Sequence, residues 1–391
     1  MSARKSICVV VSSIWTAEAV LLEQMAAMTK FYDVSLVANC DDKDRLRKQG
    51  LDVDVLYVPM NRNPSPFKDL MCLITLARLF KKRRFDVVHS VTPKAGLLGM
   101  LAARLAGVPA RVHTFTGQVW ATRTGMGRTI LKSMDRILAW AATDVLADSR
   151  SQLDFLRQQK VLAPDRGAVL ANGSIRGVDA SRFKPDGSAR ERIRRELSIP
   201  DHCCVFLFVG RLNPDKGVLT LAQAFSQVAR THPDTLLLIV GPDEAGMRPK
   251  IEQTCNEFLP RLRFVGNTSV PETYMAASDV LCLPSRREGF GNVVIEAAAA
   301  GLPAIASRIY GLTDAMVDGT TGLLHEPGDS SALASAMSQL ADSPALRRTL
   351  STAGRERVLH QFASENVIDA LQFFYQDLLG SASTGGFIHA R

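Results

Sequence analysis

Two glutamates, Glu288 and Glu296, lie eight positions apart, and the glycines Gly289 and Gly291 follow the first of them at the start of an alanine-rich segment. A glycine turn that leads into a helix presents free backbone N–H groups and a partial positive charge, which favour an anion such as a diphosphate. Glu296 lies about one turn into the expected helix, where side chains lean back toward the N-terminus. Because carboxylates accept hydrogen bonds from hydroxyls, the pattern predicts a site for a sugar joined to a nucleoside diphosphate.

A second set of charges follows the strand-like segment that ends at Gly210. Arg211 and Lys216 stand in the loop after it, where the topology of a parallel sheet places ligands. Two fixed cations at this position can neutralise a diphosphate leaving group without a metal. Alone, each could equally be a surface charge on a turn. Together with the glutamate-flanked glycine turn, they favour a binding site.

The elements that position these residues form two successive series in which strand-like and helical segments alternate. This alternation is typical of parallel sheets with helices on both faces. We therefore expect an α/β fold of two tandem, doubly wound, Rossmann-like domains facing a cleft: residues 1–180, residues 181–363, and a C-terminal stretch 364–391 whose helix returns to the first domain before a flexible tail. The expected strands are 7–11, 34–38, 53–58, 86–89, 110–114 and 144–147, then 205–210, 236–241, 263–266, 280–284 and 304–307.

Bulk properties fit a two-domain globular protein. The chain has 391 residues, of which 46% are hydrophobic and 22% charged, and no apolar run approaches the ~20 residues of a membrane-spanning helix. The apolar segment 7–11 is better interpreted as a buried first strand than as part of a signal peptide. The seven cysteines are scattered, without a Cys-x-x-Cys pair, which favours reduced thiols in a cytoplasmic protein.

The net charge of +8 is concentrated in the first half. Residues 1–180 carry 26 Lys/Arg against 16 Asp/Glu, a net +10, whereas residues 181–391 carry 21 against 23, a net −2. A basic half suggests an anionic partner. No nucleic-acid motif is recognisable, so a peripheral contact with the anionic inner face of the cell membrane is the preferred interpretation. A merely solvated basic surface remains the alternative.

Several motifs, in a fixed order, give the chain a specific resemblance. It resembles the retaining GT-B glycosyltransferases of family 4, and the segments 92–96 and 113–117 resemble the subgroup that builds bacterial capsule, O-antigen and other surface glycans. The resemblance implies a UDP-sugar donor, a polyprenyl-diphosphate-linked saccharide acceptor and no cofactor. The motifs of the second half are Gly-Arg-Leu-x-Pro-x-Lys-Gly (210–217), Glu-Gly-Phe-Gly-Asn (288–292), Ala-Ala-Gly-Leu-Pro (299–303) and Gly-Thr-Thr-Gly-Leu-Leu (319–324).

The same resemblance assigns roles to individual residues. Arg211 and Lys216 would hold the donor diphosphate, Glu288 would contact hydroxyls of the transferred sugar, and Glu296 would bind the ribose. His113, which ends an expected first-domain strand, would face the reacting sugar and complete a catalytic set with Arg211, Lys216 and Glu288; a core histidine is the alternative. The other donor-binding residues would be Gly210, Gly266, Asn267, Gly289, Phe290, Gly291, Asn292 and Val293.

The acceptor side is expected in the first domain. One departure from the family pattern is the loop 12–18, which lacks the Gly-Gly pair of many relatives, so its backbone is less free to approach a phosphate. We expect either a looser phosphate contact or a role for Trp15 against the acceptor, with local packing as the alternative. A flexible cationic loop at 118–128 could meet the acceptor's diphosphate or the membrane, or be a plain surface loop. The expected acceptor residues are Trp15, Lys94, His113, Thr114 and Arg123.

Two further patterns are assigned structural roles. Asp52 and Asp54 resemble the Asp-x-Asp of metal-dependent transferases, but we expect both on the solvent side of a strand and predict no catalytic metal. The helix near 66–84 carries an apolar stripe, which we assign to core packing, and ends in four cations that suit a helix C-terminus. The stripe is Phe67, Leu70, Met71, Ile74, Ala77 and Phe80.

The expected reaction is a front-face displacement with retention at the anomeric carbon, in which the β-phosphate accepts the proton of the acceptor hydroxyl. Cations and the helix start would stabilise the departing UDP. Two rivals stay open: a GT-B nucleotide-sugar epimerase and an inactive sugar-nucleotide-binding subunit. A dehydrogenase is disfavoured because Ser12-Ser13-Ile14-Trp15 stands where Gly-x-Gly-x-x-Gly would be required.

Overall fold

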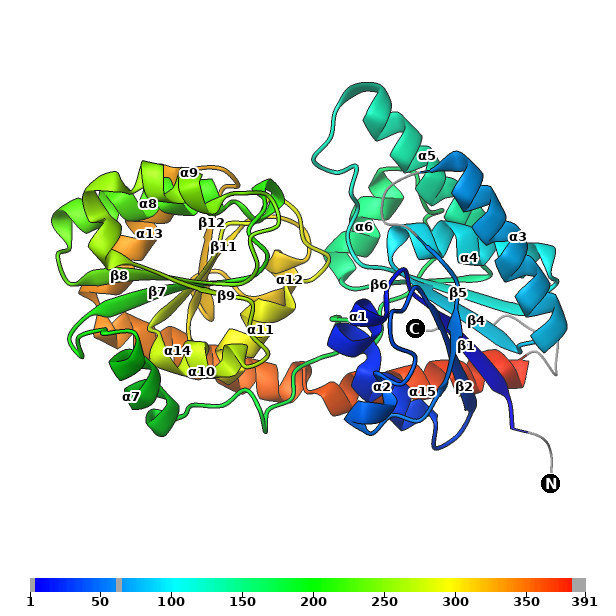
Figure 1. Ribbon diagram of the computed structural model, residues 1–391. Coiled ribbons are helices and arrows are strands. Elements are labelled where there is room, and N and C mark those ends of the chain that lie inside the picture. Colours follow the sequence, from blue (N-terminus) through cyan, green and yellow to red (C-terminus); the bar gives the residue numbers. More distant parts are fainter. Residues whose placement is uncertain (1–3, 61–64, 382–391) are drawn as a thin grey trace. The chain divides into compact units, whose positions relative to one another are not determined.

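The computed structural model describes residues 4–60 and 65–381. The chain divides into two compact units: unit 1 holds residues 1–176 and 365–391, and unit 2 holds residues 177–364. Each unit is a six-stranded parallel sheet covered by helices (Figure 1). The α/β architecture with two doubly wound sheets is therefore as the sequence predicted, and the unit boundaries lie beside the expected residues 180 and 363.

The sheet of unit 1 has the order β3-β2-β1-β4-β5-β6. Its central strands are buried on both faces, which explains their unbroken apolar sequences. His113 and Thr114 lie in register with Ser90 and Val91 of the neighbouring strand. The strands are β1 Ser6–Val10, β2 Asp33–Ala38, β3 Asp54–Tyr57, β4 Val87–Val91, β5 Ala110–Phe115 and β6 Asp144–Ala147.

Two helical layers cover this sheet (Figure 1). One layer packs α3 Pro66–Arg83, α4 Pro93–Leu105, α5 Gly125–Ala141 and α6 Arg150–Gln158 against one face. The other face is covered by the continuous helical segment α1 Ile14–Thr16, the π-turn Ala17–Leu21 and α2 Leu22–Met28, together with the C-terminal helix α15 Ser364–Ser381. Leu371 and Tyr375 of α15 are buried in this second core, so the end of the chain completes unit 1.

The sheet of unit 2 has the order β12-β11-β10-β7-β8-β9, which is the same winding as in unit 1. Its last strand, β12, was not expected from the sequence, where 319–324 was noted only as a motif. The strands are β7 Cys204–Val209, β8 Thr235–Val240, β9 Leu262–Gly266, β10 Val280–Leu283, β11 Ala304–Ser307 and β12 Gly322–His325.

The helices of unit 2 also form two layers, one with α8, α9 and α13 and one with α7, α10, α11 and α14 (Figure 1). Short turns of 3-10 helix, η3 Pro214–Lys216 and η4 Asn256–Arg261, follow β7 and α9. The helices are α7 Gly187–Glu196, α8 Val218–Thr231, α9 Arg248–Thr254, α10 Pro271–Ala277, α11 Asn292–Ala299, α12 Leu312–Ala315, α13 Ser330–Asp342 and α14 Pro344–Gln361.

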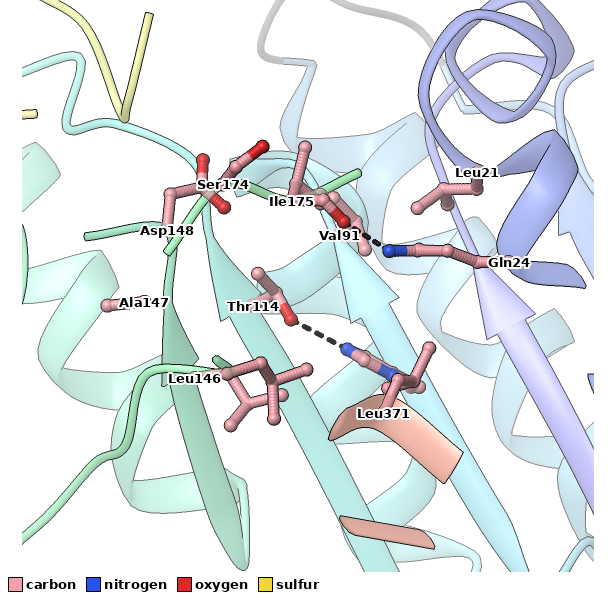
Figure 2. Close-up of a pocket in the computed structure, with 12 residues that line it drawn as sticks. Leu21, Gln24, Val91, Thr114, Leu146, Ala147, Asp148, Ser174, Ile175 and Leu371 are labelled. Carbon is pink, nitrogen blue, oxygen red and sulfur yellow. Dashed lines mark hydrogen bonds between the residues drawn. The ribbon is translucent and has the colours of Figure 1, made fainter. Parts of the chain in front are cut away.

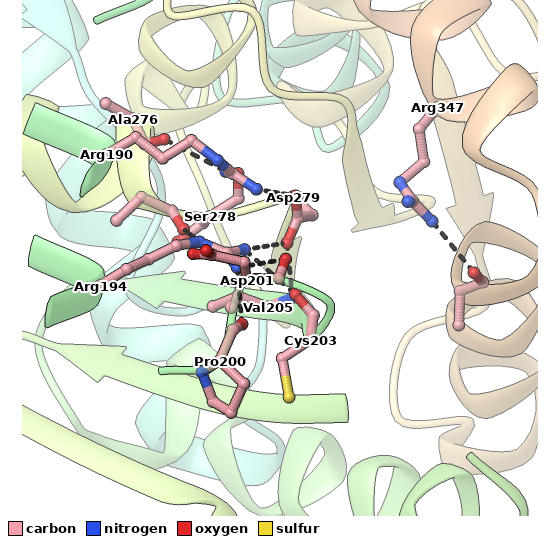
Figure 3. A network of polar contacts seen from close by, with 12 residues as sticks. Arg190, Arg194, Pro200, Asp201, Cys203, Val205, Ala276, Ser278, Asp279 and Arg347 are labelled. Atoms are coloured by element: carbon pink, nitrogen blue, oxygen red, sulfur yellow. Dashed lines mark hydrogen bonds and ion pairs between the residues drawn. The ribbon is translucent and has the colours of Figure 1, made fainter. Parts of the chain in front are cut away.

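A buried ion network fixes the amino-terminal edge of the unit 2 sheet (Figure 3). Asp279, just before β10, accepts hydrogen bonds from Arg190 (2.9 Å), Arg194 (2.7 Å) and the backbone N–H of Val205 (2.8 Å). Arg194 is only 2% exposed and also donates to the carbonyls of Ala277, Pro200, Asp201 and Cys203. Because every charge here has its partners, the network is structural, and the opposite edge of the sheet is left for ligands.

Two expectations about local structure in unit 1 were wrong. The loop expected over 12–18 is short, because Ser13 caps a helix that already begins at Ile14. Asp52 lies before β3, not on it, since the strand begins at Asp54. Only one of the two carboxylates therefore belongs to the strand, but both face solvent as predicted, where Asp52 pairs with Arg47 (2.7 Å) and Asp54 with Arg83 (2.7 Å).

The stripe of α3 was also predicted incorrectly in its first half. Phe67, Leu70 and Met71 are 76%, 53% and 50% exposed, Ile74 and Ala77 are half-buried, and Phe80 is buried. Cys72 and Leu76, which the predicted stripe did not include, are buried as well. The helix therefore leaves the core at its N-terminal end while its C-terminal half packs against the sheet.

Within residues 4–60 and 65–381, no helix has the combined length and apolar character that crossing a bilayer requires.

Candidate functional site

The candidate donor site begins at the carboxyl end of β7. Gly210 follows this strand, and its N–H bonds to the carbonyl of Val240 in β8 (2.9 Å). Arg211 comes next, half-exposed, and forms an ion pair with Glu244 (3.0 Å), which lies in the loop after β8. The guanidinium is therefore held at the strand ends, where an anionic ligand can reach it.

Lys216 is held more closely than Arg211. Asn213 caps the short helix η3 by accepting a bond from the N–H of Lys216 (3.2 Å). The ammonium Nζ then lies 2.5 Å from Oε1 of Glu288, which also accepts a bond from the hydroxyl of Ser285 (2.7 Å). Lys216 and Glu288 are 20% and 12% exposed, so the predicted cation and the predicted sugar-binding carboxylate are in direct contact.

Further contacts join the same two loops. The carboxylate of Asp215 pairs with Arg287 (2.8 Å), and its carbonyl accepts a bond from the N–H of Arg286 (2.8 Å). Gly217 has a φ of +67° and approaches Pro284 so closely that a Cβ at Gly217 would lie 1.9 Å from the carbonyl oxygen of Pro284. Only glycine fits there, and the loops after β7 and β10 are thereby fixed as one rigid body.

Helix α11 begins next to Glu288, with its N-terminus at the candidate site. Gly291, with a φ of +87°, is its N-cap, and Asn292 is the first helical residue. The free N–H groups of the first turn carry the helix's partial positive charge. Phe290 is 2% exposed, and its ring centroid lies 5.2 Å from that of Phe362. Because this side chain is buried, only the backbone of residue 290 could contact a ligand.

The remaining predicted donor residues flank this helix start. Glu296 lies in the second turn of α11 and is 5% exposed. Gly289 is buried, while Val293 is half-buried. Gly266 ends β9 and, with Asn267, is exposed; its carbonyl accepts a bond from the N–H of Gly241 (2.7 Å).

In unit 1, His113 lies within β5, which continues to Phe115, so it does not end its strand as expected. It is 1% exposed. Its Nδ1 is 2.8 Å from the hydroxyl of Ser90, and its ring packs under Gly96, where a Cβ would come within 2.4 Å of Cε1. Burial, with a smaller effect of His89, lowers the pKa of His113 to about 3; the imidazole is therefore neutral at physiological pH.

Thr114 serves a different face of the sheet because successive strand residues point in opposite directions. Its hydroxyl bonds to Nε2 of His89 (2.8 Å), whose Nδ1 bonds to the hydroxyl of Tyr375 in α15 (2.6 Å). Burial lowers the pKa of His89 to about 4. The side chains of His113 and Thr114, predicted to bind one acceptor, are thus not brought together.

The other predicted acceptor residues are scattered over unit 1. Trp15 is 55% exposed and stacks under Arg45, whose Cζ is 3.3 Å from the ring centroid. Lys94 pairs with Asp69 (2.6 Å) between the starts of α4 and α3. Arg123 is exposed in the turn before α5.

The loop expected at 118–128 is shorter, because loop and turn extend only over residues 118–124. Trp120 is 1% exposed, stacks on Phe155 at 5.3 Å and donates a hydrogen bond to Asp135 (2.7 Å). Residues 125–128 are the first turn of α5. The aromatic residue therefore anchors a core, and of the predicted loop only the turn at 121–124 leads over the surface.

Asp148 is a polar residue of this edge that sequence reasoning missed. It follows β6 directly, is 5% exposed, and its Oδ1 has no hydrogen-bond partner among the residues that the structure describes. Burial raises the pKa of its carboxyl to about 8. It lines a small cavity with Thr114 and Ser174, and Gln24 faces them from the opposite wall (Figure 2). A polar residue immediately after a predicted strand was the available signal.

The structure thus gathers the donor-side residues around the carboxyl ends of β7, β8 and β10 in unit 2. That geometry can hold a diphosphate on Arg211, Lys216 and the start of α11, with carboxylates beside it for hydroxyl groups. The acceptor-side set of unit 1 shows no comparable cluster among the described residues. Of that set, His113 is buried and neutral, whereas Trp15 and Arg123 are exposed.

Known proteins resemble this chain over most of its length. Residues 189–357 match the family described as glycosyl transferases group 1, and residues 16–173 match the glycosyl transferase 4-like domain. The chain is 31% identical over 353 residues to the capsular polysaccharide biosynthesis glycosyltransferase CapM of Staphylococcus aureus, covering 85% of this chain and 92% of that protein. It is 30% identical over 357 residues to the UDP-Gal:alpha-D-GlcNAc-diphosphoundecaprenol alpha-1,3-galactosyltransferase of Escherichia coli, covering 89% and 90%.

Solved structures share the fold. HepE of Anabaena, in complex with UDP and glucose, superposes with a TM-score of 0.81 at 20% identity, over 96% of this chain and 100% of that one. Sucrose-phosphate synthase of Thermosynechococcus elongatus gives 0.81 at 24% identity, over 97% and 100%. Fold and site together define a glycosyltransferase of the GT-B class. The chain belongs to the glycosyltransferase family that combines the group 1 and the 4-like domains.

Proposed function

We propose that this glycosyltransferase moves a sugar from a UDP-sugar to a polyprenyl-diphosphate-linked saccharide, with retention at the anomeric carbon, in bacterial surface glycan synthesis. The contact of Lys216 with Glu288 beside the start of α11 carries the proposal. It joins a diphosphate-binding cation to a hydroxyl-binding carboxylate at a helix N-terminus. The names of the two relatives, one capsular and one acting on a diphosphoundecaprenol-linked sugar, support the acceptor class.

In the proposed reaction, the bond between the anomeric carbon and the β-phosphate oxygen breaks while the acceptor hydroxyl oxygen bonds to the same face of that carbon. The β-phosphate takes the hydroxyl proton, and UDP leaves. Arg211, Lys216 and the N–H groups at 289–292 stabilise the charge on UDP as it departs. We propose that these groups suffice without a metal or a cofactor.

The donor is proposed to extend from this diphosphate site in two directions. Glu288 accepts hydroxyls of the transferred sugar, and Glu296 those of the ribose, while Gly266 and Asn267 border the base. His113 is proposed to offer a neutral imidazole to the reacting sugar; with Nδ1 engaged by Ser90, its Nε2 is the nitrogen that can serve. Trp15, Lys94, Thr114 and Arg123 stay proposed acceptor contacts.

The reaction takes place, in this proposal, at the cytoplasmic face of the cell membrane, where a lipid-linked acceptor is held. The support is the net charge of +10 on residues 1–180 and the attraction of basic surfaces to anionic lipids, which contributes about 1 kcal/mol per Lys or Arg near the surface.

The proposal is tested in two stages. A panel of UDP-sugars is first screened for thermal stabilisation of the chain, and the stabilising donor is then offered with a short polyprenyl-diphosphate saccharide in detergent. We expect transfer, an α-linked product from an α-linked donor by NMR, and unchanged turnover in EDTA. Release of UDP without a transferred sugar would favour an epimerase, and donor binding without any turnover an inactive subunit; either outcome would refute the transferase assignment.

A further inference from the structure

Helix α5 of unit 1 leaves one complete face uncovered. Its exposed apolar side chains recur every three or four positions, so they fall on one side of the helix for its whole length. The opposite side packs against the core through Leu131, Leu138 and Ala139. The exposed stripe consists of Met126 (80%), Ile130 (49%), Met134 (39%), Ile137 (46%) and Trp140 (58%).

The stripe continues onto the end of the neighbouring helix α4. Arg104 of α4 lies over the ring of Trp140, with its Cζ 4.0 Å from the ring centroid. The next residue, Leu105, is 70% exposed. The helical layer that holds α4 and α5 is the one that faces away from α15 (Figure 1), so the stripe lies on the opposite side of the sheet from the end of the described chain.

Cations border this apolar stripe without acidic partners. Arg128 and Lys132 both donate to the side-chain oxygen of Gln159 (2.9 and 3.1 Å), and Arg136 donates to the carbonyl of Lys160 (2.9 Å). Partial burial and then the neighbouring cations lower the pKa of Lys132. Within the described residues these three cations form no ion pair, so the border of the stripe carries an uncompensated positive charge.

Among the described residues, the acidic side chain of α5 forms no ion pair with these cations and points to the core. Asp135 is the one carboxylate in α5, and it is buried against Trp120, where burial raises its pKa to about 6. An amphipathic helix with an apolar face, aromatic and aliphatic side chains and a basic border matches an anionic bilayer surface. Self-association through this face is disfavoured, because a two-fold dimer would place the same cations against each other.

We propose that the α5 face, consisting of the exposed stripe, Leu105 and the bordering cations, lies in the interface of an anionic membrane and holds unit 1 on it. The helix lies in the membrane plane and does not cross it. This inference deepens the proposed function. It rests on that function in one respect: a lipid-linked acceptor would explain why the enzyme needs to bind a membrane.

The test uses the full chain and vesicles of phosphatidylcholine with or without phosphatidylglycerol. Ile130→Gln combined with Ile137→Gln removes half-exposed apolar side chains from the stripe. Phe373→Gln combined with Leu259→Gln, at 72% and 47% exposure on α15 and in unit 2, is the matched control. We expect wild type and control to co-sediment with anionic vesicles, and the stripe variant to partition about tenfold less, because two apolar anchors are lost. Binding should weaken with salt and on neutral vesicles.

Two readouts keep this test independent of folding and of the transferase assignment. Thermal unfolding checks that the stripe variant is folded, and transfer to a detergent-solubilised acceptor should stay at the wild-type rate. Equal vesicle binding by the stripe variant would overturn the proposal. So would a wild-type dimer in sedimentation velocity, without vesicles, that the variant converts to monomer. Absence of transfer with intact vesicle binding would refute only the proposed function.

Discussion

The two units have sheets of the same winding but opposite kinds of polar site. At the strand ends of unit 2, the groups are charged, partly exposed and paired with each other, as in Lys216 with Glu288 and Arg211 with Glu244. In unit 1, the polar groups within and just after the strands are buried and neutral, as in His113 inside β5 and Asp148 after β6. One winding thus supports an ionic site in one unit and a desolvated site in the other.

The comparison shows what each kind of site needs from its surroundings. Charged groups at an edge need backbone that holds their loops in place, which close contacts such as that of Gly217 with Pro284 provide. Neutral groups in a core need hydrogen-bond partners, because burial without them costs about 1–3 kcal/mol. A substitution that disturbs a backbone contact in unit 2 and one that removes a titratable group in unit 1 should therefore have different effects on the two kinds of site.

The largest effect is expected for Gly217→Ala. The new Cβ would lie 1.9 Å from a backbone oxygen at a φ of +67°, so the loop cannot relax by moving a side chain. We expect a loss of about 3 kcal/mol or more in the free energy of unfolding of unit 2, measured by urea denaturation. Gly187→Ala, whose Cβ would meet nothing within 4 Å, is the control and should stay within about 0.5 kcal/mol of wild type. Equal stability of the two variants would contradict the rigid-loop interpretation.

Lys216→Ala tests the ionic site itself. Removing a charge-stabilising group of this kind is expected to lower turnover about 100-fold or more at saturating donor, with the fold intact. Arg230→Ala is the control, since Arg230 is an exposed cation of unit 2 paired with Glu257. Near-wild-type turnover of Lys216→Ala in a transfer assay would remove Lys216 from the proposed mechanism.

Asp148→Asn tests the desolvated site. The folded-state pKa, raised to about 8, lies above the usual value, so the wild-type carboxyl favours the folded state at low pH and loses this contribution as pH rises from about 4 to 8. Asparagine does not titrate, and the variant should therefore gain stability over wild type across this window, from near zero at pH 4 to its largest value at pH 8. Thermal unfolding at five pH values measures the difference, and a pH-independent difference would contradict the assignment.

The smallest effect is expected for Tyr375→Phe. The change leaves α15 packed but removes the hydroxyl that bonds to His89, which should cost about 1 kcal/mol of the stability of unit 1. Chemical denaturation measures it, with Tyr274→Phe, a half-buried tyrosine of unit 2, as the control. A loss no larger than in the control would show that α15 is held by apolar packing alone.

The sequence predicted the fold because the strand pattern is strong in both halves. The missed strand β12 is short, and two of its four residues are only half-buried, so its pattern is weak. In the second half, the sequence predicted Arg211, Lys216 and Glu288 at one edge of the sheet because each follows the carboxyl end of a strand, and the carboxyl ends of parallel strands share one edge.

Predictions for the first half were less accurate because the alternation of side chains between the two faces of a strand was not taken into account. His113 and Thr114 are neighbours in sequence, yet the pleat turns one toward α4 and the other toward His89 and α15. Trp120 lies in a turn, as expected, but its burial was not predicted because its partners, Phe155 and Asp135, lie 35 and 15 positions further on. Contacts of this kind depend on tertiary packing, which local spacing does not reveal.

The position of α15 has a consequence for biosynthesis. Because unit 1 is closed by residues after 364, unit 2 is an insertion between two parts of one core. The first 176 residues leave the ribosome with one sheet face covered only in part, by α1, the π-turn and α2. The place of α15 stays open until all of unit 2 has been translated, roughly 10–40 s at usual elongation rates. Unit 1, which begins the chain, is therefore the last to finish folding. Deletion of α15 is expected to expose the core that the N-terminal residues form.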